Sequence, residues 1–379
     1  MTPTLPVELW RRIFRLTTYT GADLDQVIKH ELDSDKFTEC KQNYLRTIET
    51  KVAISHVSRQ FRCIASEFLF EFVSIDKPSQ ALKLETLMEE SSTSDGPRDC
   101  IKFLFVRCTD ESIMPRVTNV LRLCRDLRGF SWNHPISQTR FQDRRLVEDE
   151  MLRSIPTNLR FLNWNSLVYL NVLDAFLHNA SDSLEGLYIN GFLLNPPPNR
   201  CTTFPALTHL DVRCIASCNW LDKWIMPSLN ELHLPYGYSY SDERCPGVLT
   251  HAGMSLRVLR LGTSFRVTPN LLSQILCICP KLEEIYYFVH PNDDLCPWES
   301  EATHVLLRMV GIDFVGTGFG GYDKVQDYFG SISKTRFPSL HTIMVDDIFF
   351  DGSTERVRII MESKSDNFGS AEIRMVQFL

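Results

Sequence analysis

One hydrophobic pattern recurs along most of this sequence. Residues 207–212 read Leu-Thr-His-Leu-Asp-Val, and residues 229–234 repeat the same spacing of apolar positions 22 residues later. In both copies a proline, Pro205 or Pro227, stands two residues before the first leucine. Such a period indicates one structural unit copied along the chain, in which neighbouring copies share a continuous apolar core.

The complete series predicts the architecture. Members of the form apolar-x-x-apolar-x-apolar follow one another at spacings of 22 to 33 residues. They begin at Ile101, Leu127, Leu159, Leu184, Leu207, Leu229, Leu256, Leu282, Leu307, Leu340 and Ile373. Helical spacing between members predicts return helices over residues 117–123, 167–177, 271–278 and 357–361. A strand with a helical return is typical of a leucine-rich repeat, so the predicted fold class is an α/β solenoid with a parallel sheet on its concave face.

The N-terminal segment has helical rather than repeat patterning. Leu9, Ile13 and Leu16 share one face of a helix that begins near Pro6. A second helix is predicted over residues 44–57, and Ser58 is a suitable N-cap for a third. Three short helices bury little apolar area, so this unit needs a partner or the rest of the chain for stability.

These residues resemble an F-box, in the form common in fungal proteins. The resemblance rests on Leu5-Pro6-x-Glu8-Leu9 with Ile13-Phe14, followed by Val57-Ser58-Arg59-Gln60-Phe61-Arg62-x-Ile64-Ala65. It implies binding to a Skp-type adaptor within a cullin-RING ubiquitin ligase. The adaptor contacts that it implies are Leu5, Pro6, Leu9, Ile13, Val57 and Ser58. The alternative interpretation is a plain helical cap on the repeat array.

The resemblance and the repeats together suggest three regions. Residues 1–76 would form a three-helix F-box, with a charged insertion at about residues 19–43 that is longer than the family's and is expected to be exposed. Residues 77–99 would form a linker helix and loop, and residues 100–379 the repeat array.

The repeats are similar to the cysteine-containing class of leucine-rich repeats that is found after F-boxes. In that class an Asn or Cys stands three residues past the strand, but this chain has Ile215, Gly237, Ser264 and His290 there. A buried amide ladder is therefore missing, and we expect an irregular horseshoe.

Alternation across each strand predicts which side chains face the concave side. The candidate target-binding residues are Phe161, Asn163, Tyr188, His209, Asp211, Arg213, Glu231, His233, Arg260, Tyr286 and Phe288. Exposed aromatic residues together with Arg and Asn are a typical interface composition, so the face is interpreted as a partner-recognition surface. In-register stacking would place His209 beside Glu231 and Asp211 beside His233.

Composition narrows the choice of partner. The net charge of −7 and the pI near 5.8 argue against nucleic acid or an anionic membrane as the main partner. The N-terminus shows no secretory signal, and no apolar run reaches the roughly 18 residues of a membrane helix. Most of the twelve cysteines, among them Cys100, Cys124, Cys277 and Cys279, sit beside apolar neighbours, so they are expected to be reduced, buried thiols in a cytoplasmic or nuclear protein.

Other motifs point only weakly to chemistry. His209, Asp211, Glu231 and His233 include suitable zinc ligands, but cross-strand charge pairing on a flat sheet is favoured over metal binding. Residues 316–321 match G-x-G-x-x-G without a surrounding βαβ unit, and the closely spaced cysteines Cys214/Cys218 and Cys277/Cys279 lack a second pair at zinc-finger spacing. Familiar hydrolase, metalloprotease and Walker motifs are absent from the sequence, so no catalytic residue, metal or cofactor is predicted.

The function predicted from the sequence is the substrate-recognition subunit of an SCF-type ubiquitin ligase. Its N-terminal helices would dock the adaptor, and its repeats would bind a protein target. A scaffold or regulator that works outside ubiquitin ligation is the alternative. A nucleotide- or metal-binding enzyme is a remote one.

Overall fold

The computed structural model describes most of the chain as two compact units. It describes residues 5–18, 34–90, 97–133, 141–166, 168–191, 193–194, 200–214, 218–234, 247–263, 265–289, 296–299, 302–314, 332–333, 335–347, 356–362 and 372–378. The units are Met1–Leu187 and Tyr188–Leu379.

The first unit begins with helices α1 (Val7–Thr17), α3 (Ser34–Ser55) and α4 (Arg59–Leu69). The predicted cap of α4 is confirmed, because the Ser58 hydroxyl accepts a hydrogen bond from the backbone N–H of Phe61 at 3.1 Å. Phe14, Ile64 and Phe68 form a buried cluster in which α1 packs on α4. The predicted helical character of this segment is therefore confirmed, whereas its identity as an F-box stays a prediction.

The second of these helices is longer than predicted. It begins at Ser34 rather than near residue 44, so the last ten residues of the expected exposed insertion, 34–43, are part of a helix. Residues 19–33, the rest of that insertion, lie outside the described residues.

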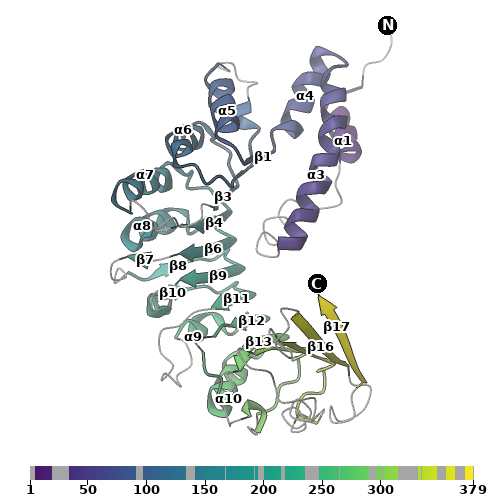
Figure 1. The fold of residues 1–379 in the computed structure, drawn as a ribbon, viewed down its shortest axis with the longest axis vertical. Coiled ribbons are helices and arrows are strands. Elements are labelled where there is room, and N and C mark those ends of the chain that lie inside the picture. Colours follow the sequence, from purple (N-terminus) through teal and green to yellow (C-terminus); the bar gives the residue numbers. More distant parts are fainter. Residues whose placement is uncertain are drawn as a thin grey trace. The chain divides into compact units, whose positions relative to one another are not determined.

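The rest of the first unit alternates strands and helices. Its strands are β1 (Phe72–Ile75), β2 (Phe103–Val106), β3 (Gly129–Asn133), β4 (Phe161–Asn165) and the short β5 (Val168–Tyr169), and β6 (Gly186–Gly191) begins at its end. The helices are α5 (Pro78–Glu90), α6 (Met114–Leu123), α7 (Phe141–Ser154) and α8 (Leu170–Ala180), with 3-10 turns η1 (Pro97–Asp99) and η2 (Glu111–Ile113). Strands β1 to β4 pair in sequence order, all parallel. Figure 1 shows α6, α7 and α8 stacked along one side of these strands.

The parallel sheet starts earlier than the sequence suggested. Strand β1 pairs in register with β2, from Phe72 opposite Phe103 to Ile75 opposite Val106. The predicted linker helix, α5, therefore lies between two paired strands and serves as the return of the first repeat. The repeat array thus includes residues that were assigned to the F-box end and to the linker.

The second unit continues the same architecture. Its longer strands are β9 (His209–Cys214), β11 (Glu231–Leu234), β12 (Val258–Leu261), β13 (Glu284–Val289), β14 (Met309–Phe314), β15 (Thr342–Asp347), β16 (Arg356–Glu362) and β17 (Glu372–Phe378). The shorter elements are β7 (Leu193–Leu194), β8 (Thr202–Thr203), η3 (Cys218–Lys223), β10 (Trp224–Ile225), α9 (Val248–Ala252), α10 (Pro269–Ile278) and η4 (Pro297–Glu299). Strands β9, β11, β12, β13, β14 and β15 pair in this order and are parallel.

A recurrent turn directly precedes several of the strands. The first ten members of the apolar series each begin two residues before a strand of a parallel sheet, so their positions are confirmed. At Leu207, Leu229, Leu282 and Leu340 the backbone N–H donates to the carbonyl three residues earlier, at 3.1–3.4 Å. The prolines noted in the sequence stand inside these turns, where a fixed φ is compatible with the chain reversal. All four leucines are buried, which joins the turn to the core.

The C-terminal end departs from the prediction. Residues 357–361 were expected to form a return helix but lie in strand β16, which pairs antiparallel with β15. The last member of the series, at Ile373, lies in β17, which pairs antiparallel with β16. Val357, Ile359 and Met361 alternate with other residues at the period of a strand, and a short apolar run does not by itself distinguish a strand from a helix.

Within the described ranges, no helix is both long and apolar enough to cross a membrane.

Candidate interaction sites

Helix α1 has two apolar faces. Trp10 and Phe14 face inward, with ring centres 4.6 Å and 5.0 Å from that of Phe61 on α4. Leu9 and Ile13 lie on the outward face and are 44% and 37% exposed. A helix that is apolar on both sides buries only one of them within its own unit, so the outward face is a candidate docking surface.

All six adaptor contacts implied by the F-box resemblance are exposed to solvent. They are Leu5, Pro6, Leu9, Ile13, Val57 and Ser58. Leu16, one turn beyond Ile13, is 70% exposed and extends the same face, although the resemblance did not include it. Ser58 also has a structural role, because its hydroxyl caps α4.

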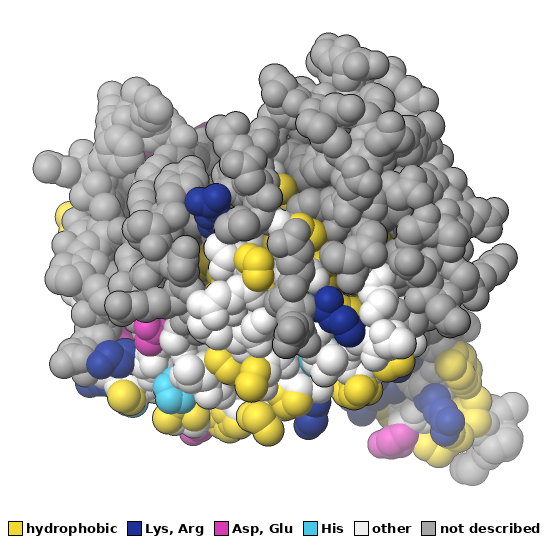
Figure 2. Space-filling model, turned by 90° about the horizontal axis from the view of Figure 1, so that it is seen from below, with side chains coloured by type: hydrophobic (Ala, Val, Ile, Leu, Met, Phe, Trp, Pro, Cys, Tyr) yellow, Lys and Arg dark blue, Asp and Glu magenta, His cyan; other side chains and the backbone are white. Residues whose placement is uncertain are grey.

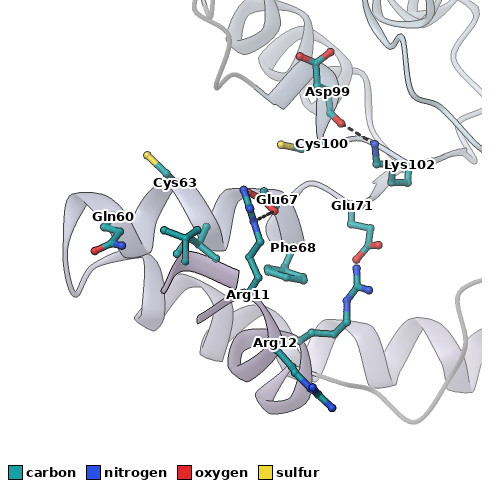
Figure 3. Close-up of a pocket in the computed structure, with 13 residues that line it drawn as sticks. Arg11, Arg12, Gln60, Cys63, Glu67, Phe68, Glu71, Asp99, Cys100 and Lys102 are labelled. Atoms are coloured by element: carbon teal, nitrogen blue, oxygen red, sulfur yellow. Dashed lines mark hydrogen bonds and ion pairs between the residues drawn. The ribbon is translucent and has the colours of Figure 1, made fainter. Parts of the chain in front are cut away.

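A cavity of about 830 Å³, which was not predicted from the residue patterns, lies on the other side of α1 (Figure 3). Its walls carry charges of both signs. Arg11 donates to Glu67 at 2.7 Å, and the Lys102 ammonium donates to the Asp99 carbonyl at 2.9 Å. Burial raises the pKa of Glu71, against the effect of nearby cations, chiefly Arg15. The cavity is thus a mixed-charge junction between the helices and the first repeats.

Strands β9 and β11 bring together the predicted histidines and carboxylates. His209 faces Glu231 and Asp211 faces His233 in the observed register, as predicted. The His209 Nε2 to Glu231 Oε2 distance is 3.2 Å, and His233 Nδ1 lies 2.9 Å from Asp211 Oδ2. Asp211 also accepts a hydrogen bond from Arg213 Nε at 3.2 Å.

This arrangement favours charge pairing. Each histidine contacts a single carboxylate on the neighbouring strand. Throughout the described part of the chain, His, Cys, Asp and Glu side chains form no group of three or more that could hold a metal ion.

Strands β12 to β14 carry a stacked arrangement of side chains. The Arg260 guanidinium lies 4.2 Å from the centre of the Tyr286 ring. The Tyr286 hydroxyl donates to Glu284 Oε2 at 2.9 Å and lies 3.0 Å from Met309 Sδ. Burial of the phenol and the neighbouring Glu284 carboxylate raise the pKa of Tyr286, so it remains a neutral hydrogen-bond donor.

Four predicted target-binding residues are buried rather than exposed. They are Phe161, Asn163, Tyr188 and Asp211, with exposures of 0%, 7%, 4% and 3%. Phe161 is covered in part by Arg160, whose guanidinium lies 5.5 Å from the ring centre, and Asp211 is covered by Arg213 and His233.

The remaining predicted residues of the concave face keep contact with solvent. Arg260 is exposed, and the others are partly exposed: His209, Arg213, Glu231, His233, Tyr286 and Phe288. The partly exposed residues of this face include histidine, arginine, glutamate and aromatic side chains, a mixture typical of protein interfaces. Figure 2, which views the molecule from below, shows hydrophobic side chains interspersed with single basic, acidic and histidine residues on the described part of that end.

The glycine-rich motif and the cysteines add no binding site among the described residues. Residues 316–321 lie outside the described residues, as do Ile215, Gly237, Ser264 and His290. Cys63, Cys108, Cys124, Cys201 and Cys277 carry free thiols. Cys124 is buried as expected, and burial raises its pKa to about 12, which suppresses the reactive thiolate. Cys277 was expected to be buried but is exposed.

Comparisons with known proteins give a limited result. No protein-family model matches the chain, and no curated protein matches it. A search of solved structures finds the leucine-rich repeat-containing protein LegL7 from Legionella pneumophila, at 15% identity and a TM-score of 0.38. The match covers 73% of this chain and 83% of that chain. The fold assignment therefore rests on this chain's own repeated strands and helices.

Proposed function

We propose that this protein is the substrate-recognition subunit of an SCF-type ubiquitin ligase. The observation that carries the proposal is the outward apolar face of α1, where Leu9, Ile13 and Leu16 are exposed while the inward face packs on α4. The F-box resemblance predicts that a Skp-type adaptor covers this face. The repeats supply a second, separate surface for a protein target.

The proposed mechanism is proximity. The adaptor and cullin would hold the protein near a charged conjugating enzyme, while the repeats hold the target beside it. The transfer of ubiquitin to a target lysine then becomes an effectively intramolecular step. No residue of this chain performs chemistry in this proposal.

A matched pair of substitutions tests the adaptor site. Leu9 on α1 and Leu82 on α5 are exposed to nearly the same extent, 44% and 45%. Leu9→Asp should abolish co-purification of a Skp-type adaptor, because it places a charge in an apolar contact. Leu82→Asp should leave the adaptor bound. The proposal fails if Leu9→Asp binds the adaptor as well as the wild type does.

Ubiquitin transfer separates the proposal from a scaffold function. A bound target should gain ubiquitin in a reconstituted ligase that contains the wild-type protein, and should not with Leu9→Asp. Stable target binding without modification in the complete ligase would instead favour a scaffold or regulator.

A further inference from the structure

Most charged side chains on the concave face of the second unit already have partners on the chain. His209 pairs with Glu231, and Asp211 pairs with His233 and Arg213. Glu284 accepts a hydrogen bond from the Tyr286 hydroxyl. These side chains already have hydrogen-bonding or ion-pairing partners on the chain, so they are less available to bind a ligand directly.

Arg260 is different. Its side chain is exposed, and among the described residues no carboxylate forms an ion pair with it. Its guanidinium lies instead 4.2 Å from the centre of the Tyr286 ring. Stacking on an aromatic ring orients the planar guanidinium while its N–H donors stay available, and it reduces the conformational entropy that binding would cost.

The Tyr286 ring that supports Arg260 is itself held in place. Its hydroxyl is fixed by Glu284, and its ring lies against Gly311, the in-register residue of β14. A Cβ atom at position 311 would overlap the ring, so glycine makes room for it. Arg260 is therefore part of a preorganised site rather than a mobile surface arginine.

We propose that Arg260, stacked on Tyr286, binds a side-chain carboxylate of the protein target. This inference rests on the proposed function, because it assigns the class of residue that the target surface recognises. A carboxylate matches the forked N–H donors of arginine in a bidentate pair. Val258, Met309 and Met344 are half-buried on the same face, so the preferred target segment carries an apolar residue beside its Asp or Glu.

The neighbouring charges favour a carboxylate over a phosphate. In the strand register, Glu231 and Glu284 lie on the two strands that flank β12, on the same face as Arg260. Two nearby carboxylates repel a dianion more strongly than a monoanion. His233, which is opposite Arg260, already contacts Asp211.

Peptide selection tests this proposal. A random-peptide phage library is panned against the full-length protein in complex with its adaptor, and selected sequences are synthesised for affinity measurement. We expect enrichment of Asp or Glu beside an apolar residue. Replacing that acid by its amide should weaken binding by about tenfold or more, since a charge-assisted pair contributes about 1.5–3 kcal/mol.

Substitutions of Arg260 test whether this residue binds the acidic side chain of the selected peptides. Arg260→Ala should weaken binding of the acidic peptide by about as much as the acid-to-amide change, and Arg260→Lys should restore only part of it. Lys281→Ala, which removes an equal charge from an exposed position in the turn before β13, should leave binding unchanged. Failure to select any peptide, peptides without acidic enrichment, or equal binding to Arg260→Ala would each overturn the proposal. Tighter binding of a phosphoserine analogue would overturn the choice of a carboxylate.

Adaptor binding separates the two proposals. Arg260→Ala should still co-purify the Skp-type adaptor, and Leu9→Asp alone should still bind the selected peptide. Loss of adaptor binding with Leu9→Asp but no effect of Arg260→Ala on peptides would overturn only the present inference. Normal adaptor binding by Leu9→Asp would overturn the proposed ligase function and leave the carboxylate site standing.

Discussion

The aromatic ring of Tyr286 lies against the backbone of Gly311, its in-register neighbour on the next strand. A Cβ atom at position 311 would overlap the ring carbons Cδ1 and Cε1. The ring can therefore hold its position only beside a residue without a side chain. Because Arg260 stacks on the same ring, the glycine also governs the orientation of the guanidinium.

Gly311→Ala should therefore lower the free energy of unfolding by about 1–3 kcal/mol, because the new methyl group displaces the Tyr286 ring. In a Tyr286→Ala background the same change should cost less than about 1 kcal/mol, since the obstructing ring is gone. Urea unfolding of the four proteins in this double-mutant cycle measures the difference. Equal costs in both backgrounds would show that the ring does not occupy this position.

Two carboxylates on neighbouring strands differ in their contact with solvent. The Asp211 side chain is 4% exposed and the Glu231 side chain is 43% exposed, although each contacts a histidine. Asp211→Ala should lower the free energy of unfolding by about 1–3 kcal/mol, because Arg213 and His233 lose a buried partner. Glu231→Ala should lower it by less than about 1 kcal/mol. Urea unfolding of the two variants tests whether Asp211→Ala loses more stability than Glu231→Ala. Similar losses of stability would argue that the burial of Asp211 is unimportant.

Ile13 and Phe14 are adjacent on α1 but differ in their contact with solvent. Phe14 is 3% exposed and Ile13 is 37% exposed. Phe14→Ala should destabilise the protein by about 3–5 kcal/mol through loss of core packing, whereas Ile13→Ala should have an effect below about 1 kcal/mol. Adaptor binding should show the opposite selectivity, with weaker binding by the folded Ile13→Ala variant. Thermal unfolding and adaptor titration of the two variants test this, and a large stability loss from Ile13→Ala would contradict the two-faced helix.

The strands are the part of this fold that the sequence predicts most directly. Their apolar positions recur locally, and several leading residues, such as Leu207, close a short turn directly before the strand. Strand β1 is harder to find, because Phe72–Ile75 lacks the full repeat pattern and follows the helical segment without a break. Its assignment depends on pairing with β2, a contact between distant parts of the chain.

The concave face was predicted less well, because alternation shows which side of a sheet a residue faces but not what covers it. Phe105 is buried on this face by stacking with Phe72, which in turn contacts Tyr44 of α3. Local patterning contains no information about this row of rings. The cavity behind α1 was missed for the same reason, since its walls come from distant segments that include Arg11 and Lys102.

Lys51 provides a pH-dependent test of the packing of α3. Its ammonium group lies 4.0 Å from the centre of the Tyr44 ring, and the residue is 4% exposed. Burial lowers the pKa of Lys51 to about 8, although the nearby Glu71 acts in the opposite direction. Burial also raises the pKa of Tyr44, so the phenol stays neutral over the pH range in which Lys51 titrates.

The lowered pKa of Lys51 predicts greater stability at alkaline pH. Between about pH 8 and the ordinary lysine pKa of 10.5, the unfolded chain keeps a proton that the folded chain releases, so the free energy of unfolding rises with pH. Below about pH 8 both states are charged, and the full cost of burying the charge remains. The melting temperature of the wild type minus that of Lys51→Met should therefore rise between pH 7 and pH 10, by about 2 °C or more. Lys83→Met, at an exposed position on α5, should show no such trend. A flat difference for Lys51→Met would mean that the ammonium reaches solvent and that α3 packs less tightly here.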